Sequence, residues 1–268
     1  MPLIDTHCHV SPLWYEPVAS LLTQMDRNGI DHAVLIQMQG QYDNDYQFDC
    51  VRRHPGLFAP VVCLDTDAPD APATLERLAA QGASGVRLLA TTRSPGDDPL
   101  LLWRVAARLR LPVSCAGSGT TFGTPEFAAL VAALPDLTIV IEHLGSVAAP
   151  DADDRAAAAR RATFALARFP NTRIKVTGLG EFCRRVVPVV GDFPFARPLP
   201  PYLAEAHAAF GPTRMMWGSD YPPVSGREGY TNALHLTMAE LARLPRYTDA
   251  DRDQIFGGTA LTTFPPRP

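Results

Sequence analysis

The chain has 268 residues, of which 46% are hydrophobic and 19% are charged, and its formal net charge is −4. This length suits one domain spanning residues 1–268 and can bury a sizeable core. The slight acidic excess argues against a nucleic-acid partner, and no run approaches the roughly 18–20 apolar residues of a membrane span.

The number and spacing of the cysteines bear on the cellular compartment. There are five, and none lies in a Cys-x-x-Cys motif: Cys8, Cys50, Cys63, Cys115 and Cys183. Several lie in apolar runs, where cysteine behaves as a small hydrophobic residue. An odd, unclustered set favours reduced thiols. The first apolar run starts at residue 3, which leaves no room for a signal peptide. We therefore expect a cytoplasmic protein.

Short apolar runs alternate with amphipathic segments along the chain. Eight runs predict strands, at 3–9, 32–38, 58–64, 84–89, 112–116, 138–143, 173–177 and 214–219. Apolar spacing near 3.6 predicts helices at 71–81, 98–109, 125–134, 154–168 and 201–210. Eight βα units in about 250 residues predict an α/β fold with a single (β/α)8 TIM barrel. A doubly wound open sheet is the alternative, but no glycine-rich phosphate loop follows the first strand.

The connection over residues 179–200 is long and rich in proline. Such a loop inside a compact domain is uncommon and is often functional. It follows the seventh strand, so in a barrel it lies on the catalytic face. We expect a lid there or, alternatively, an interface in a homo-oligomer.

In a (β/α)8 barrel the active site forms where the strands end, and polar side chains stand at most of these ends. They are His7, His9, Gln37, Arg87, Ser114, Glu142, His143, Lys175, Ser219 and Asp220. Side chains two residues apart on a strand share a face. His7 and His9 can therefore act together on a metal ion or on a carbonyl oxygen.

Three motifs in this order resemble the amidohydrolase superfamily: Ile4-Asp5-Thr6-His7-Cys8-His9, Ile139-Val140-Ile141-Glu142-His143-Leu144-Gly145 and Met216-Trp217-Gly218-Ser219-Asp220-Tyr221-Pro222. They are most similar to its amidohydrolase-related branch, which contains 2-pyrone-4,6-dicarboxylate lactonase and sugar lactonases. The resemblance implies a hydrolase that opens the lactone ring of a small acidic or polyhydroxylated compound. The alternatives are a zinc-dependent decarboxylase of an aromatic or muconate-type acid, as in the sister branch, and a non-catalytic barrel.

The departures from the superfamily pattern bear on metal binding. Its binuclear members carry a bridging lysine or glutamate and two further histidines, whereas the fifth strand here offers Ser114 and Cys115, and the seventh offers Lys-Val-Thr. The resemblance to the lactonase branch implies catalysis without a cofactor. The alternative is one zinc ion held by His7, His9, His143 and Asp220, a set that suits zinc.

Each candidate residue has a role that its chemistry suggests. Asp220 would be the general base that activates water, or a cap of the following turn. His7, His9 and His143 would stabilise the oxyanion, unless they bind metal or only pack. For substrate binding we expect Arg87, whose planar fork suits a carboxylate unless it forms a buried salt bridge. Further candidates for substrate contact are Gln37, Tyr46, Lys175 and Arg184.

Overall fold

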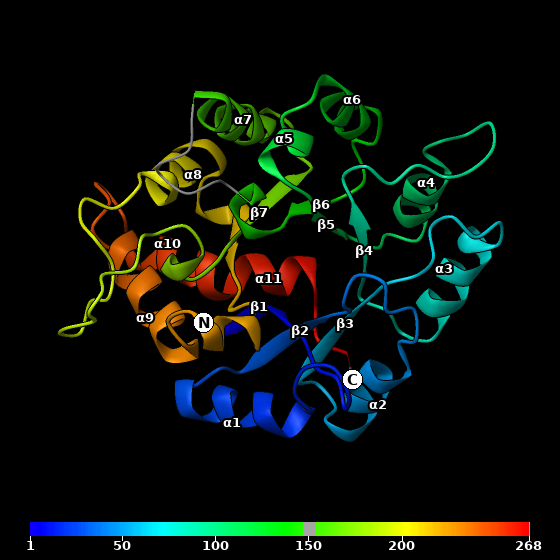
Figure 1. Cartoon of the computed structure of the whole chain (residues 1–268). Coiled ribbons are helices and arrows are strands. Elements are labelled where there is room, and N and C mark those ends of the chain that lie inside the picture. Colours follow the sequence, from blue (N-terminus) through cyan, green and yellow to red (C-terminus); the bar gives the residue numbers. More distant parts are fainter. Residues whose placement is uncertain (147–153, 268) are drawn as a thin grey trace.

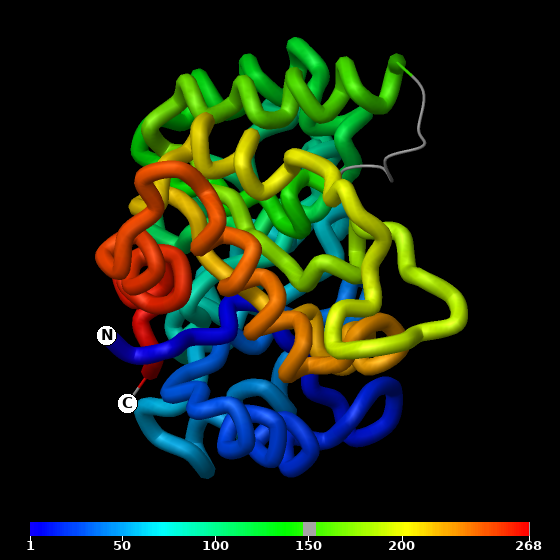
Figure 2. The backbone as a smooth tube through the Cα atoms, turned by 90° about the vertical axis from the view of Figure 1, so that its left-hand side faces the viewer, coloured from blue at the N-terminus to red at the C-terminus, as the bar shows by residue number. Residues whose placement is uncertain are grey.

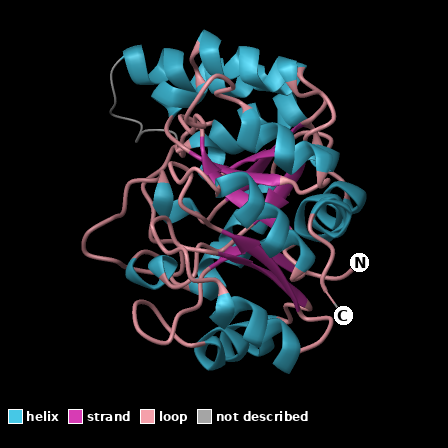
Figure 3. Ribbon diagram, turned by 90° about the vertical axis from the view of Figure 1, so that its right-hand side faces the viewer, coloured by secondary structure: helices cyan, strands magenta, loops and turns pink. Residues whose placement is uncertain are grey.

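The computed structural model describes residues 1–146 and 154–267. Its eight parallel strands form one sheet in sequential order, with helices packed around them (Figures 1 and 3). The strands are β1 (Ile4–Cys8), β2 (His32–Ile36), β3 (Phe58–Val62), β4 (Gly85–Leu89), β5 (Val113–Ala116), β6 (Ile139–Ile141), β7 (Thr172–Val176) and β8 (Met215–Trp217). The eight strands predicted from the sequence are present, and the (β/α)8 barrel is confirmed.

The helices lie outside the sheet. They are α1 (Val18–Asn28), α2 (Asp45–Arg53), α3 (Ala71–Ala80), α4 (Leu101–Arg108), α5 (Gly119–Phe122), α6 (Pro125–Ala133), α7 (Asp154–Phe164), α8 (Tyr202–Phe210), α9 (Tyr230–Leu241), α10 (Asp249–Asp253) and α11 (Thr259–Thr263). Short single turns are η1 (His143–Gly145), η2 (Ala165–Arg168), η3 (Leu179–Glu181), η4 (Pro212–Arg214), η5 (Pro223–Gly226) and η6 (Gln254–Gly258). The five predicted helices are present, with the last turn of 154–168 formed by η2.

Tyr46, a candidate for substrate contact, lies in the first turn of a helix, since Asp45 begins α2. Phe48 and Val51 lie one turn apart on the buried side of this helix, and an acidic first-turn residue favours a helix start. Tyr46 is therefore held by a helix.

The barrel closes between β1 and the segment after β8. Cys8 and Tyr221 form a parallel bridge, and the Asp220 N–H donates to the His7 carbonyl at 2.7 Å. Gly218 permits this approach, since a Cβ there would lie 2.6 Å from the Cβ of His7. The closure places His7 and Asp220 side by side on the rim where the strands end.

The barrel interior contains an apolar cluster and, next to it, a layer of polar side chains. A compact cluster consists of Val34, Ile36, Ala59, Val61, Val140, Met216 and Phe264. Beside it, four polar side chains are buried or nearly so: Arg87, Ser114, Glu142 and Lys175. Buried charges persist only where they are paired and hydrogen-bonded. We therefore expect these four side chains to form a hydrogen-bonded network.

The two termini lie close together on one side of the molecule, and the segment after η3 projects from the opposite side (Figure 2). Within this segment Arg185 and Phe195 form an antiparallel bridge. Val187 and Val190 at its tip are 82% and 72% exposed. Across the described ranges no helix has the length and apolar character needed to span a bilayer. The five cysteines are free and buried.

Candidate active site

A cavity of about 580 Å³ opens at the strand ends of the barrel. The loop after β1 contributes Trp14 and Tyr15 to its wall, and the loop after β2 contributes residues 38–41. The described residues that line it are His9, Trp14, Tyr15, Met38, Gln39, Gly40, Gln41, Arg87, His143, Glu181, Asp220 and Pro223. Three of the four expected catalytic side chains thus face one cavity, and His7 lies directly behind them.

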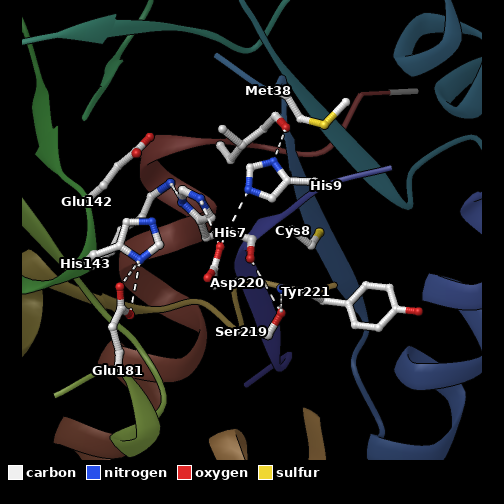
Figure 4. A network of polar contacts seen from close by, with 12 residues as sticks. His7, Cys8, His9, Met38, Glu142, His143, Glu181, Ser219, Asp220 and Tyr221 are labelled. Atoms are coloured by element: carbon white, nitrogen blue, oxygen red, sulfur yellow. Dashed lines mark hydrogen bonds and ion pairs between the residues drawn. The ribbon is translucent and has the colours of Figure 1, made fainter. Parts of the chain in front are cut away.

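Asp220 stands at the centre of the cluster (Figure 4). Its Oδ1 lies 3.6 Å from His9 Nε2 and 3.9 Å from His7 Nε2. Its Oδ2 accepts hydrogen bonds from both terminal nitrogens of Arg227 at 3.0 Å. Burial alone would raise the pKa of Asp220, but His9, His143 and Arg227 outweigh it and lower the pKa. The side chain is therefore a carboxylate at neutral pH.

The backbone holds two of these residues in an uncommon conformation. The φ angles of Asp220 and His143 are 58° and 52°, in the left-handed region that side chains other than glycine rarely occupy. Such strain persists where the surrounding structure enforces it, and it concentrates at functional sites. Both residues lie within three positions of the end of a strand, β6 or β8, where the strained turn presents their side chains to the cavity.

His143 is paired with Glu181, a residue that the sequence-based analysis missed. His143 Nδ1 lies 3.0 Å from Glu181 Oε1, so Nδ1 donates to the carboxylate and Nε2 is left for the cavity. Burial alone would lower the pKa of His143, but the charge and hydrogen bond of Glu181 raise it. The only sequence signal for Glu181 was its place in the 179–200 connection.

His9 is oriented by the backbone of the neighbouring strand. Its Nδ1 lies 2.7 Å from the carbonyl oxygen of Ile36, which can only accept, so Nδ1 carries a hydrogen. Its Nε2 then faces Asp220. The ring of Tyr15 lies beside that of His9, with centroids 5.6 Å apart.

His7 differs from His9 because its Nδ1 faces a hydrogen-bond donor instead of an acceptor. Its Nδ1 lies 3.1 Å from the ammonium nitrogen of Lys175, and its Nε2 is a buried atom for which the described residues provide no hydrogen-bond partner. Burial and the positive charge of Lys175 hold the pKa of His7 well below its usual value. His7 is therefore neutral.

Arg87 forms a two-pronged ion pair with Glu142, at 3.1 Å from Nε and 2.8 Å from Nη2. The buried salt bridge that was the alternative for Arg87 is thus present, although its side chain also lines the cavity. Burial would raise the pKa of Glu142, but Arg87 and Lys175 lower it to about 2.

The other expected substrate contacts do not line the cavity. Lys175 is fully buried, and Arg184 is exposed on the projecting segment. The Gln37 side chain donates to the Asp43 carbonyl and accepts from the Met38 N–H. The hydroxyl of Tyr46 accepts from the backbone N–H of Val18 at the start of α1. The side chains of Gln37, Tyr46 and Lys175 therefore serve local or internal contacts.

Ser219, the neighbour of Asp220, forms structural hydrogen bonds and does not line the cavity. Asp5 accepts the Ser219 N–H at 2.8 Å and the Ser219 hydroxyl at 2.6 Å. The hydroxyl of Tyr230 in α9 donates to the same carboxylate at 2.7 Å. Asp5 therefore fastens the segment after β8 to β1 and fixes the position of Asp220.

The cluster partly meets the needs of a metal ion. Donor atoms of His7, His143 and Asp220 lie within 4.8 Å of one another, a spacing compatible with one ion. A ligating histidine donates its other N–H to an acceptor, as His143 does to Glu181. His7 instead has the Lys175 ammonium at its other nitrogen. The hydrogen bonding of His7 therefore opposes a zinc ion at this triad.

Comparisons with known proteins show a family match and a curated relative over most of the chain. The amidohydrolase family model matches residues 4–265. The L-fucono-1,5-lactonase of Burkholderia ambifaria is 29% identical over 241 residues, which cover 87% of this chain and 80% of that protein.

Solved structures share the fold over nearly the whole chain. An amidohydrolase from Burkholderia multivorans with bound zinc has 22% identity and a TM-score of 0.77, over 99% of this chain and 100% of its own. A proposed 2-pyrone-4,6-dicarboxylic acid hydrolase from Pseudomonas putida has 23% identity and a TM-score of 0.72, over 98% and 97%. A 5-carboxyvanillate decarboxylase from Sphingomonas paucimobilis has 16% identity and a TM-score of 0.64, over 99% of each chain. At these identities the likeness shows the fold alone.

Proposed function

This chain belongs to the amidohydrolase family, and we propose that it is a lactonase acting on a neutral, polyhydroxylated lactone. The observation that carries the proposal is the charged Asp220 carboxylate in the cavity, with the imidazoles of His7 and His9 within 4 Å of its Oδ1. A carboxylate that can bind water, beside an imidazole N–H that can bind the carbonyl oxygen, is what the attack of water on an ester carbonyl requires. The sequence relative that is a lactonase supports the same reaction class.

Asp220 orients the attacking water and receives its proton. Arg227 occupies Oδ2, so Oδ1 is the oxygen that accepts the water hydrogen. The lowered pKa makes Asp220 a weak base. Its contribution therefore lies mainly in fixing the water against the carbonyl carbon, an effect that can account for several kcal/mol of barrier.

Two histidines supply hydrogen bonds to the oxygens of the substrate. His7 Nε2 is buried without a partner among the described residues, which suits a donor reserved for the carbonyl oxygen as it becomes an oxyanion. His143 has a raised pKa, which suits the acid that protonates the ring oxygen. When the carbon–oxygen bond breaks, the water proton is on Asp220 and the ring oxygen holds the proton from His143.

The charges around the cavity favour a neutral substrate over an acidic one. Arg87 is the one arginine or lysine among the described lining residues, and Glu142 already neutralises it. Glu181 and Asp220 would repel a substrate carboxylate. The amides of Gln39 and Gln41 and the aromatic ring of Trp14, which is 71% exposed, offer hydrogen bonds and a stacking face. Such groups suit the hydroxyls and ring of a sugar lactone.

A panel assay with and without chelator tests this proposal. The panel contains aldono-1,4- and 1,5-lactones, a dicarboxylated pyrone lactone and aromatic carboxylic acids. We expect hydrolysis of aldonolactones above the spontaneous rate, with no loss on chelation. Release of carbon dioxide from an aromatic acid only with added zinc would contradict it and would favour the decarboxylase alternative. Preference for the dicarboxylate would overturn the substrate class alone.

A further inference from the structure

A connected series of hydrogen bonds runs beneath the cavity from Arg87 to His7. Arg87 donates to Glu142, and the hydroxyl of Ser114 donates to the same carboxylate at 2.7 Å. Lys175 Nζ lies 2.9 Å from Ser114 Oγ and 3.1 Å from His7 Nδ1. Lys175 is the single lysine of the chain, and it is fully buried.

The direction of each bond follows from the chemistry of the groups. The Glu142 carboxylate can only accept, so the one hydroxyl hydrogen of Ser114 is directed to it. The Ser114 oxygen must then accept from Lys175. An ammonium group has three hydrogens and no lone pair, so it also donates to His7 Nδ1. The hydrogen of the neutral His7 ring is consequently on Nε2.

We propose that Lys175 is a positioning residue that holds His7 as its Nε2–H tautomer, which makes His7 a hydrogen-bond donor and withholds it from metal. The geometry supports this assignment, because the Glu142 carboxylate bonded to Ser114 provides a negative charge beside the Lys175 ammonium. The catalytic consequence rests on the proposed lactonase function, whereas the tautomer and the effect on metal affinity do not.

The neighbouring histidines show what a metal ligand would need. His143 and His9 each direct Nδ1–H to an acceptor, Glu181 and the Ile36 carbonyl, so that Nε2 has a lone pair whenever the ring is neutral. His7 lacks such an acceptor because Lys175 occupies that place. Removal of the ammonium would free the ring to carry its hydrogen on Nδ1 and to offer Nε2 to an ion. The triad of His7, His143 and Asp220 would then become a better zinc site.

The tautomer can be read directly by long-range 15N–1H correlation spectra of protein labelled at histidine. The His7 signals are assigned by their loss in His7→Asn. We expect Nε2–H for His7 at pH 7 in the unaltered protein. A ring protonated on Nδ1 would overturn the proposal, and this result depends on no variant of Lys175.

The variant Lys175→Met keeps the length of the side chain and removes its donors. We expect its zinc affinity, measured by competition with a chromophoric chelator, to rise at least about tenfold, with kcat lowered and KM little changed. Cys115→Ala, a buried change on β5 beside Ser114, is the matched control and should leave zinc affinity unchanged. Equal zinc affinity in the unaltered protein and in folded Lys175→Met would contradict the proposal. A confirmed tautomer with no lactone hydrolysis would overturn the proposed function only.

Discussion

Arg227 holds Asp220 through both of its terminal nitrogens, each 3.0 Å from Oδ2. The pair leaves Oδ1 directed at His7 and His9. Arg227 follows the short turn η5, seven residues after Asp220, so the loop after β8 carries both the carboxylate and the group that orients it.

Replacement of Arg227 by lysine tests this relationship. Lysine keeps the charge but cannot bind one oxygen with two nitrogens in a fixed plane. We expect kcat to fall about 10- to 100-fold, because small displacements of a positioned group cost that much, with KM nearly unchanged. Steady-state kinetics on the best lactone measures both constants. A raised KM at constant kcat would instead place Arg227 in substrate binding.

The pH dependence of kcat follows from His143 and Glu181. Glu181 raises the pKa of His143, so the protonated acid is present below that pKa and is lost as the pH rises through it. Activity should therefore decline on the alkaline side. In Glu181→Gln the carboxylate charge is gone, and the decline should move to lower pH. An alkaline limb at the same pH in both proteins would show that another group controls it.

Acid stability depends on Glu142, whose pKa is about 2 in the folded protein against 4.5 normally. A carboxyl with a lowered pKa contributes stability that is fully present above pH 4.5 and is lost as the pH falls toward 2. The shift corresponds to about 3 kcal/mol. Urea unfolding between pH 6 and pH 2 should show this loss.

The control for this acid effect is Glu142→Gln. It should be less stable at pH 6, because Arg87 is left with an unpaired buried charge. Its free energy of unfolding should also change less between pH 5 and pH 2 than that of the unaltered protein. The same slope in both proteins would assign acid sensitivity to other carboxyls.

The sequence predicted the barrel well because its signals are local. Each strand is a short apolar run, and the eight runs recover the eight strands. His7 and His9 were brought together by strand geometry alone, and Asp220 by its place after β8. Because the strands are parallel, their ends place these residues on one rim of the barrel.

Residues whose roles depend on contacts between distant loops were harder to predict. Glu181 meets His143 from 38 positions away, and no local pattern marks that pairing. Arg227 was missed because it lies beyond the motif that contains Asp220. Gln37 and Tyr46 were chosen for their nearness to a strand end, but their polar atoms are used by the backbones of adjoining segments.

The most direct test of the proposed reaction compares ring opening by the unaltered protein and by Asp220→Asn. Both are assayed on the best aldonolactone with chelator present, and the spontaneous rate is subtracted. We expect kcat of Asp220→Asn to be lower by about 10³-fold, with unchanged circular dichroism. Full activity in that variant would show that Asp220 does not activate the attacking water.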